Sequence, residues 1–284
     1  MNTAKDEFRI GGDLRVHRLG FGAMRVTGSG VWGEPPDHRE AVRLIRRAIE
    51  LGINLIDTAD AYGPEVSELI IAEAIHPYPA DLVIATKGGY TRPGPNSWVP
   101  NGRPEHLRQA LEGSLRRLRL ERIDLYQLHT PDPEVSLEES ITALAELRAA
   151  GKIRHIGVSN FSADQVKAAA AIVPIVSVQN NYNLAYRDSE PVLDYCEEKG
   201  IGFIPYFPLG YGNLLRNKRL NEIAGRAHAT PAQVALAWLL RHSPVILPIP
   251  GTSSVAHLEE NTQARAVTLD DADLKSLDRS ARSI

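Results

Sequence analysis

Acidic, basic and phenolic side chains stand directly after three successive apolar runs of this chain. Asp57 and Tyr62 follow the first of these runs, Lys87 follows the next, and His129 follows the third. A free phenol has a pKa of about 10, and a neighbouring ammonium lowers that pKa because it favours the phenolate. We therefore expect a proton donor built on Tyr62 and Lys87. Asp57 would supply the counter-charge that a buried lysine needs, and His129 would orient a carbonyl oxygen beside the phenol.

Each of these residues also has an ordinary structural explanation. Asp57 or Asp60 could cap a helix, Lys87 could be a solvated loop lysine, and His129 could be a structural histidine. Taken singly, those explanations are favoured. Four such residues in order after three successive apolar runs favour the catalytic interpretation.

Short apolar runs recur along the whole chain and predict the elements that position these side chains. The runs are nearly continuous rather than alternating, which is typical of parallel strands covered on both faces. They lie at residues 18–22, 53–56, 82–86, 123–128, 153–159, 175–179, 201–206 and 245–250. Amphipathic helical patterns lie between them, one of them following a cap at Asp37 and another opening at Pro104.

Eight strands alternating with helices predict a (β/α)8 TIM barrel, with an open doubly wound sheet as the alternative. Residues 8–10 and 14–16 flank a Gly-Gly-Asp turn and predict an N-terminal β-hairpin that closes the amino-terminal end of the barrel. Long βα connections at residues 24–36 and 88–103 would cover the opposite end, where barrel enzymes carry their chemistry. A chain of 284 residues could form two domains, but this pattern favours a single barrel domain over residues 1–284.

The composition excludes several classes of protein. With 32 Lys+Arg and 35 Asp+Glu, the net charge of −3 is too balanced for a nucleic-acid or polybasic membrane binder. The single cysteine, Cys196, excludes an internal disulfide, and the scattered histidines give no metal-binding motif. The polar N-terminal stretch, residues 1–7, has no signal-peptide pattern, so we expect a cytoplasmic protein. Residues 28–33 fit the dinucleotide-binding pattern G-x-G-x-x-G, but Glu34-Pro35-Pro36 follows where the helix of that motif should begin. The sequence therefore argues against a Rossmann fold.

Ordered motifs along nearly the whole chain resemble the aldo-keto reductase superfamily. The segments that carry the resemblance are LGFGAM at residues 19–24, NLIDTADAYG at 54–63, TK at 86–87, QLH at 127–129, IGVSNF at 156–161, VQN at 178–180, and residues 205–210 and 249–261. Residues 245–260 are most similar to bacterial members of the pyridoxal reductase type. The resemblance implies an Asp57/Tyr62/Lys87/His129 tetrad that protonates a carbonyl oxygen while a reduced nicotinamide delivers hydride to the carbon.

The same resemblance implies a cofactor site along the barrel mouth. Ser159, Asn160 and Gln179 would hold the nicotinamide carboxamide, and Tyr206 would stack on the ring. The pyrophosphate would lie along Phe207, Pro208, Leu209, Gly210 and Gly212. The adenosine end would meet Gly251, Thr252, Ser254, His257, Glu260 and Asn261, near a helix N-terminus that favours phosphate.

The chain departs from its relatives at three cofactor positions. Many relatives carry Lys where Gly251 stands and Arg where His257 stands, and both grip the 2′-phosphate; a neutral His is a weaker partner. Phe207 replaces a common Ser. Because relatives with this loop resemble NADPH users, we expect NADPH, with NADH as the alternative.

The substrate is expected to be a small carbonyl compound. Trp32, Tyr90 and Trp98 could line an apolar pocket, or could be ordinary loop anchors. Pyridoxal is favoured on resemblance alone, with a sugar-derived or xenobiotic carbonyl as the alternative. A cofactor-binding regulatory protein and a phosphate-handling barrel lyase are further alternatives, and a monomer is the superfamily default.

Overall fold

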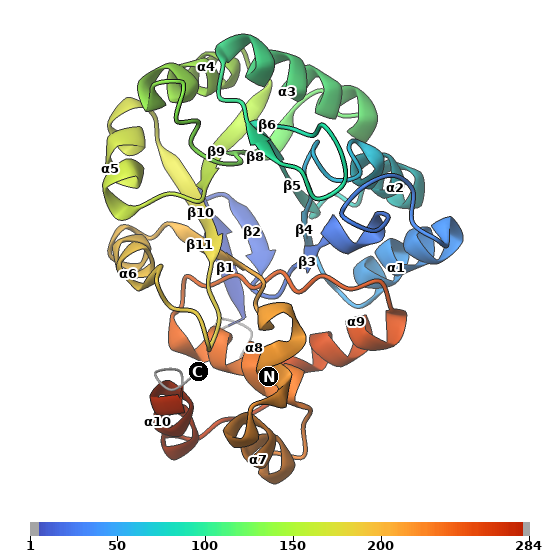
Figure 1. The fold of residues 1–284 in the computed structure, drawn as a ribbon, viewed down its shortest axis with the longest axis vertical. Helices are drawn as coiled ribbons and strands as arrows, with labels where there is room; N and C mark the ends of the chain where they lie inside the picture. The colour runs from blue at the N-terminus through green and yellow to red at the C-terminus, as the bar shows by residue number, and fades with distance from the viewer. Residues whose placement is uncertain (1–5, 281–284) are drawn as a thin grey trace.

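A curled parallel sheet forms the centre of the computed structural model, which describes residues 6–280 except for the side chains of residues 211, 213 and 280. The sheet has the strand order β11-β10-β9-β8-β5-β4-β3, and every neighbouring pair is parallel. Its strands are β3 (Phe21–Gly22), β4 (Leu55–Asp57), β5 (Val83–Gly88), β8 (Ile123–Leu128), β9 (Ile153–Ser159), β10 (Ile175–Asn181) and β11 (Gly202–Tyr206). Figure 1 shows the helices arranged around the outside of these strands.

The eighth apolar run does not form a regular strand, which corrects the expectation for residues 245–250. Pro244, Pro248 and Pro250 lack the N–H groups that a strand ladder needs. The run still closes the ring: Leu247 N donates to Phe203 O at 2.8 Å on one side, and Gly20 N donates to Pro248 O at 2.9 Å on the other. These bonds join β11 to the residues before β3, so the (β/α)8 prediction is confirmed and the open-sheet alternative is wrong.

Helices follow the strands as the periodicity predicts. They are α1 (His38–Glu50), α2 (Val66–Ile75), α3 (Pro104–Leu118), α4 (Leu137–Ala149), α5 (Ala163–Ile172), α6 (Glu190–Lys199), α7 (Lys218–Arg226), α8 (Pro231–His242), α9 (Val255–Thr262) and α10 (Asp271–Ser280), with 3-10 turns at Ala23–Val26, Gly210–Arg216 and Gln263–Ala266. Asp37 caps α1 by accepting a hydrogen bond from Glu40 N, and Pro104 opens α3. None of the helices in the described part of the chain is long and apolar enough to cross a membrane.

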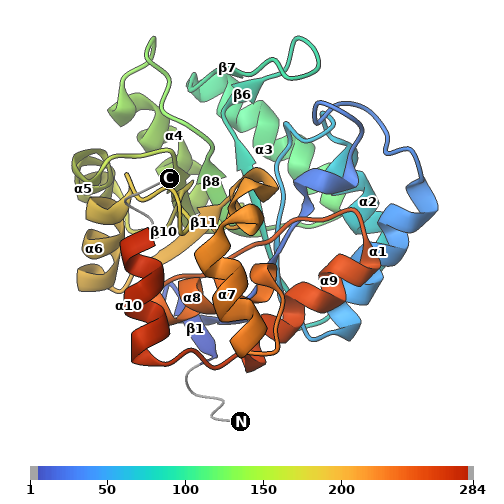
Figure 2. The same ribbon diagram turned by 60° about the horizontal axis from the view of Figure 1, so that its bottom comes forward.

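The predicted N-terminal hairpin is present and plugs one end of the barrel. Strands β1 (Glu7–Ile10) and β2 (Leu14–His17) pair antiparallel, and Ile10, Leu14 and Val16 are buried against the barrel interior. Their neighbours in this small core are Leu55, Val83, Ala85, Leu125, Ile204, Leu247 and Ile249. Figure 2 places β1 at the end of the molecule opposite to β6 and β7. Residues 1–5 of the polar N-terminal stretch lie outside the described residues.

Both long βα connections contain short elements of secondary structure. Residues 88–103 contain a small antiparallel pair, β6 (Tyr90–Thr91) with β7 (Val99–Pro100). Residues 24–36 contain a 3-10 turn and a bridge between Trp32 and Gly63. Backbone pairing within and between these loops can therefore shape a site at the barrel mouth.

Candidate active site

The four predicted catalytic side chains come from neighbouring elements at the barrel mouth. Asp57 is the last residue of β4, Lys87 is the penultimate residue of β5, His129 directly follows β8, and Tyr62 lies in the loop between β4 and α2. The Lys87 Nζ atom lies 2.6 Å from Asp57 Oδ1 and 3.2 Å from the Tyr62 hydroxyl oxygen, and it donates to Thr58 O at 2.8 Å. Asp57 does not cap a helix, because α2 begins only at Val66.

A buried hydrogen-bond network fixes Asp57. Its Oδ2 atom accepts from Gln127 Nε2 at 3.2 Å and from Gln179 Nε2 at 2.8 Å, while Oδ1 faces Lys87. Lys87 is fully buried and Asp57 nearly so. Burial alone would lower the pKa of Lys87, but the Asp57 carboxylate and the Tyr62 oxygen more than offset it, so the net direction is upward. The lysine is therefore charged at neutral pH.

The direction of the Tyr62 pKa corrects the expectation from sequence. Burial raises the pKa of the Tyr62 hydroxyl, and the opposing effect of the Lys87 ammonium does not fully cancel that rise. Tyr62 therefore keeps its proton in the resting site. The ammonium still stabilises a phenolate once the proton has left, because charges interact strongly where water is excluded.

His129 is neutral and enclosed by aromatic rings. Burial, together with the charges of Lys87 and Arg92, holds the pKa of His129 well below its ordinary value. Its ring meets Tyr90 edge-on at a centroid distance of 4.7 Å, Tyr62 at 5.8 Å and Trp98 at 6.1 Å. A neutral imidazole carries one N–H donor, which suits a carbonyl oxygen.

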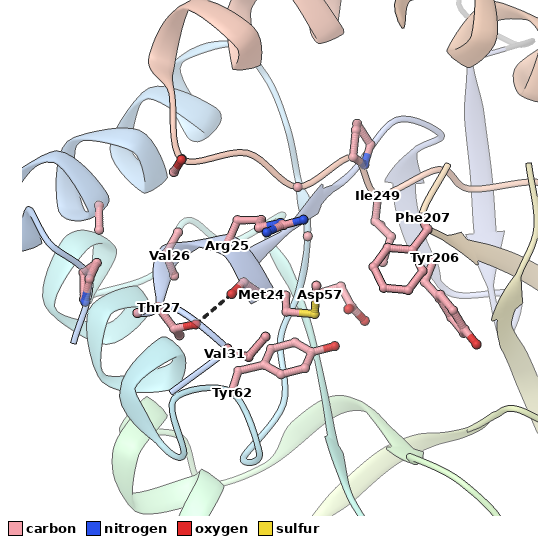
Figure 3. Close-up of a pocket in the computed structure, with 18 of the residues that line it drawn as sticks. Met24, Arg25, Val26, Thr27, Val31, Asp57, Tyr62, Tyr206, Phe207 and Ile249 are labelled. Carbon is pink, nitrogen blue, oxygen red and sulfur yellow. Dashed lines mark hydrogen bonds between the residues drawn. The ribbon is translucent and has the colours of Figure 1, made fainter. Parts of the chain in front are cut away.

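A cavity of about 1280 Å³ opens above these residues. Figure 3 shows Tyr62 and Asp57 facing it from one side and Tyr206, Phe207 and Ile249 from the other. The predicted residues that line it are Asp57, Tyr62, Tyr90, Trp98, His129, Ser159, Asn160, Gln179, Tyr206, Phe207, Pro208, Leu209, Gly212, Gly251 and His257. Pockets for one small ligand measure about 300–1,000 Å³, so this cavity has room for a dinucleotide and a small substrate together.

The orientation of Tyr206 is fixed by its neighbour across the cavity. Its hydroxyl donates to Asn160 Oδ1 at 2.7 Å, and Asn160 Nδ2 donates to His129 O at 3.0 Å. The Tyr206 ring is therefore held beside the amide and hydroxyl groups of Asn160 and Ser159. These groups could hold the carboxamide of a nicotinamide, as the sequence predicts, with an aromatic face next to it.

Seven predicted residues lie outside the lining in the described part of the chain: the fully buried Lys87, and Trp32, Gly210, Thr252, Ser254, Glu260 and Asn261. Ser254 caps α9 by accepting from His257 N at 3.5 Å, and Thr252 Oγ1 accepts from Ser254 N at 3.0 Å. Glu260 accepts from Thr230 at 2.7 Å. Their roles toward a cofactor stay predictions, and the neighbouring Ser253 lines the cavity instead.

Arg25 is a cavity residue that the sequence analysis missed. It directly follows the LGFGAM motif, and among the described residues that line the cavity it is the one arginine or lysine. No described residue forms an ion pair with it. Figure 3 shows its side chain extended toward the segment that carries Ile249.

A side chain at residue 251 would clash with the backbone of Gly22. A Cβ atom on Gly251 would lie 2.7 Å from the carbonyl oxygen of Gly22 and 3.6 Å from Arg25 Cγ. The basic residue of this part of the cavity therefore comes from the first long loop. Together with Ser253 and His257 it offers a phosphate both charge and hydrogen-bond donors, so the residues present fit a dinucleotide.

Comparisons with known proteins give a match along nearly the whole chain. Residues 18–282 match the sequence profile described as "Aldo/keto reductase family". The chain is 45% identical over 278 residues to pyridoxine 4-dehydrogenase of Escherichia coli, a match that covers 95% of this chain and 97% of that protein.

Solved structures resemble the whole barrel. A glycerol dehydrogenase from Gluconobacter oxydans superposes with a TM-score of 0.89 at 30% identity, covering 97% of this chain and 95% of that one. An aldo-keto reductase from Klebsiella pneumoniae, solved in complex with NADPH, superposes with a TM-score of 0.83 at 27% identity over 97% of this chain and 95% of its own.

Proposed function

This chain belongs to the aldo/keto reductase family, and from that premise we propose that it reduces an aldehyde or ketone to an alcohol with NADPH. The observation that carries the proposal is the Asp57–Lys87–Tyr62 contact at the cavity wall, with Lys87 Nζ 2.6 Å from one partner and 3.2 Å from the other. A fully buried lysine held against a phenol in a cavity wall suits a proton donor, because the ammonium stabilises the phenolate that forms.

The protein residues would divide the work of proton transfer. The N–H of neutral His129 orients the carbonyl oxygen beside Tyr62, and Tyr62 donates its proton to that oxygen as negative charge develops there. Lys87 stabilises the resulting phenolate, and Asp57 keeps Lys87 charged. A bound reduced nicotinamide supplies the hydride that completes the reduction.

We propose pyridoxal as the substrate. Tyr90 and Trp98 meet edge-on at 5.4 Å and form an aromatic wall beside His129, which suits a flat aromatic aldehyde. The 45% identity to a pyridoxine 4-dehydrogenase supports the same substrate class. The likeness to a glycerol dehydrogenase makes a small polyol-derived carbonyl the competing substrate.

A panel of carbonyl compounds tests the function and the substrate together. NADPH oxidation should be measured with pyridoxal, an aromatic aldehyde, glyceraldehyde and a simple ketone, and each should be repeated with NADH. Turnover with any of them supports the reaction class, and pyridoxal is expected to give a kcat/KM about tenfold or more above glyceraldehyde. A reversed order would point to a sugar-derived carbonyl, and no oxidation with any compound would contradict the function.

Replacing Arg25 tests the cofactor preference. We propose that Arg25 binds the 2′-phosphate, so Arg25→Ala should weaken NADPH binding about tenfold and leave NADH binding unchanged. Dissociation constants follow from quenching of tryptophan fluorescence. Arg108→Ala, an exposed arginine on α3 paired with Glu146, is the control and should change neither constant. Equal weakening of NADPH and NADH would place Arg25 at the pyrophosphate, and no change would remove it from the cofactor site.

A further inference from the structure

Arg92 is a buried arginine at a point where three loops meet. Its Nε atom donates to Ser97 O at 2.7 Å within its own loop, and its Nη2 atom donates to Gly30 O at 3.1 Å. The Nη1 atom donates to Val31 O at 3.1 Å and to Ala61 O at 2.6 Å. One side chain therefore connects both long mouth loops to the loop that carries Tyr62.

The backbone of these loops meets at the same place. Gly63 N donates to Val31 O at 3.2 Å, and Asn96 N donates to Gly30 O at 3.1 Å. We call residues 30–33, 61–63 and 96–98 the three-loop junction. Arg92 is the one side chain in the described structure whose guanidinium bonds to all three parts of it.

The charge of Arg92 has no carboxylate partner among the described residues. The residue is 8% exposed, and burial lowers the pKa of its guanidinium, although it stays protonated. Burying a cation without a counter-ion is costly unless its donors are satisfied. Here the guanidinium donates hydrogen bonds to four backbone carbonyl oxygens. Such bonds hold the backbone of the loops in place.

The flat face of the guanidinium supports the catalytic rings. Its central carbon lies 3.6 Å from the centroid of the Trp98 ring, a close cation–π contact. Trp98 in turn meets Tyr62 edge-on at 6.3 Å and His129 at 6.1 Å. Arg92 is thus connected to Tyr62 in two ways. It stacks on Trp98, which contacts the Tyr62 ring, and it bonds the carbonyl of Ala61, the residue before Tyr62.

We propose that Arg92 is a positioning residue that fixes Tyr62 and the Trp98 wall by tying the three-loop junction together. Asp57 and Lys87 lie on strands and are held by the sheet, whereas Tyr62 lies in a loop and needs another anchor. A misplacement of about 1 Å at a reacting group can cost about 100-fold in rate. The effect on catalysis rests on the proposed function, while the effect on the loops does not.

Arg92→Ala is the main test. It should lower kcat about 10- to 100-fold with at most a threefold change in the KM for the carbonyl substrate, because the proton donor is displaced more than the pocket is emptied. In the protein without cofactor, acrylamide should quench tryptophan fluorescence more strongly, because Trp98 loses its stacking partner. Added guanidinium ion should restore part of the lost kcat.

Arg92→Lys keeps the charge and covers the case in which Arg92→Ala fails to fold. A lysine ammonium cannot make the four carbonyl hydrogen bonds of the planar guanidinium. The kcat should therefore still fall about tenfold, and acrylamide quenching of tryptophan fluorescence should still rise. Arg18→Ala is the matched control. Arg18 is equally buried and bonds the carbonyls of Leu240, Ser243 and Ile246, at the end of the barrel away from the cavity. The Arg18→Ala variant should have a lower thermal stability. Its kcat and its acrylamide quenching should equal those of the wild type, and added guanidinium ion should not raise its kcat.

Two results would overturn the proposal. One is that Arg92→Lys has the same kcat and the same acrylamide quenching as the wild type. That result would mean that the four hydrogen bonds of the guanidinium are not needed to position Tyr62. The other is the same fall in kcat for Arg18→Ala, which would mean that general destabilisation explains the effect. If wild-type protein turns over no carbonyl compound, the proposed function fails, yet the quenching comparison in cofactor-free protein still decides whether Arg92 ties the loops.

Discussion

Tyr62→Phe should lower the kcat for carbonyl reduction about 1,000-fold or more while the dissociation constant for NADPH changes less than about threefold. The ring and its contacts with Trp98 and His129 remain, so the pocket keeps its shape and only the proton donor is lost. Steady-state turnover of the best carbonyl substrate and fluorescence titration with NADPH measure the two effects separately. An unspecific loss of structure would change both.

Tyr126→Phe is the matched control for that experiment. Tyr126 lies on β8, is fully buried, and its hydroxyl has no hydrogen-bond partner in the described structure. Removing an unsatisfied buried hydroxyl should leave kcat unchanged and leave stability equal or slightly higher. Turnover by Tyr62→Phe equal to that of the wild type would contradict the assignment of Tyr62 as the acid.

Lys87→Met and Asp57→Asn, alone and combined, should separate the catalytic role of the ion pair from its structural role. Each single change leaves one buried charge without its partner and should cost about 3–5 kcal/mol of unfolding free energy. Each should also lower kcat about 100-fold or more, because the phenolate formed on Tyr62 loses its stabilising ammonium or the anchor of that ammonium.

The double variant is the decisive member of the set. It contains neither buried charge, so urea denaturation should show most of the lost stability restored, while kcat stays as low as in Lys87→Met. Recovery of both quantities would mean that the ion pair only maintains the fold. Failure to recover stability would mean that the network of Gln127 and Gln179 around Asp57 depends on the carboxylate itself.

Sequence patterns predict this barrel well where one apolar run makes one buried strand. The side chains that follow consecutive parallel strands must meet at one edge, which is why Asp57, Lys87 and His129 could be placed together without coordinates. The eighth run shows the limit of that reasoning. Its apolar pattern is correct, but its prolines remove the donors of a ladder, and only contacts with Phe203 and Gly20 reveal that it closes the ring.

Properties that depend on the surroundings of a group could not be predicted from its neighbours in sequence. The charge of Lys87 suggests a lowered Tyr62 pKa, yet desolvation outweighs that charge, and desolvation depends on the packing of loops. Arg25 and Arg92 look like ordinary loop arginines in the sequence. Their significance comes from the paths of the two long connections, which bring Arg25 to the cavity and Arg92 to two other loops.

The irregular closure of the barrel links ligand binding to resistance against unfolding. Between β11 and β3 the ring is held by a few hydrogen bonds of residues 245–248 rather than by a full ladder, so this seam has no regular strand pairing. Gly22 and Gly251 continue from the two sides of this seam, and both line the cavity. A ligand that contacts both Gly22 and Gly251 would hold the two sides of this seam together. The fully loaded protein would then be harder to open than the empty one, by an amount that grows with ligand concentration relative to its dissociation constant.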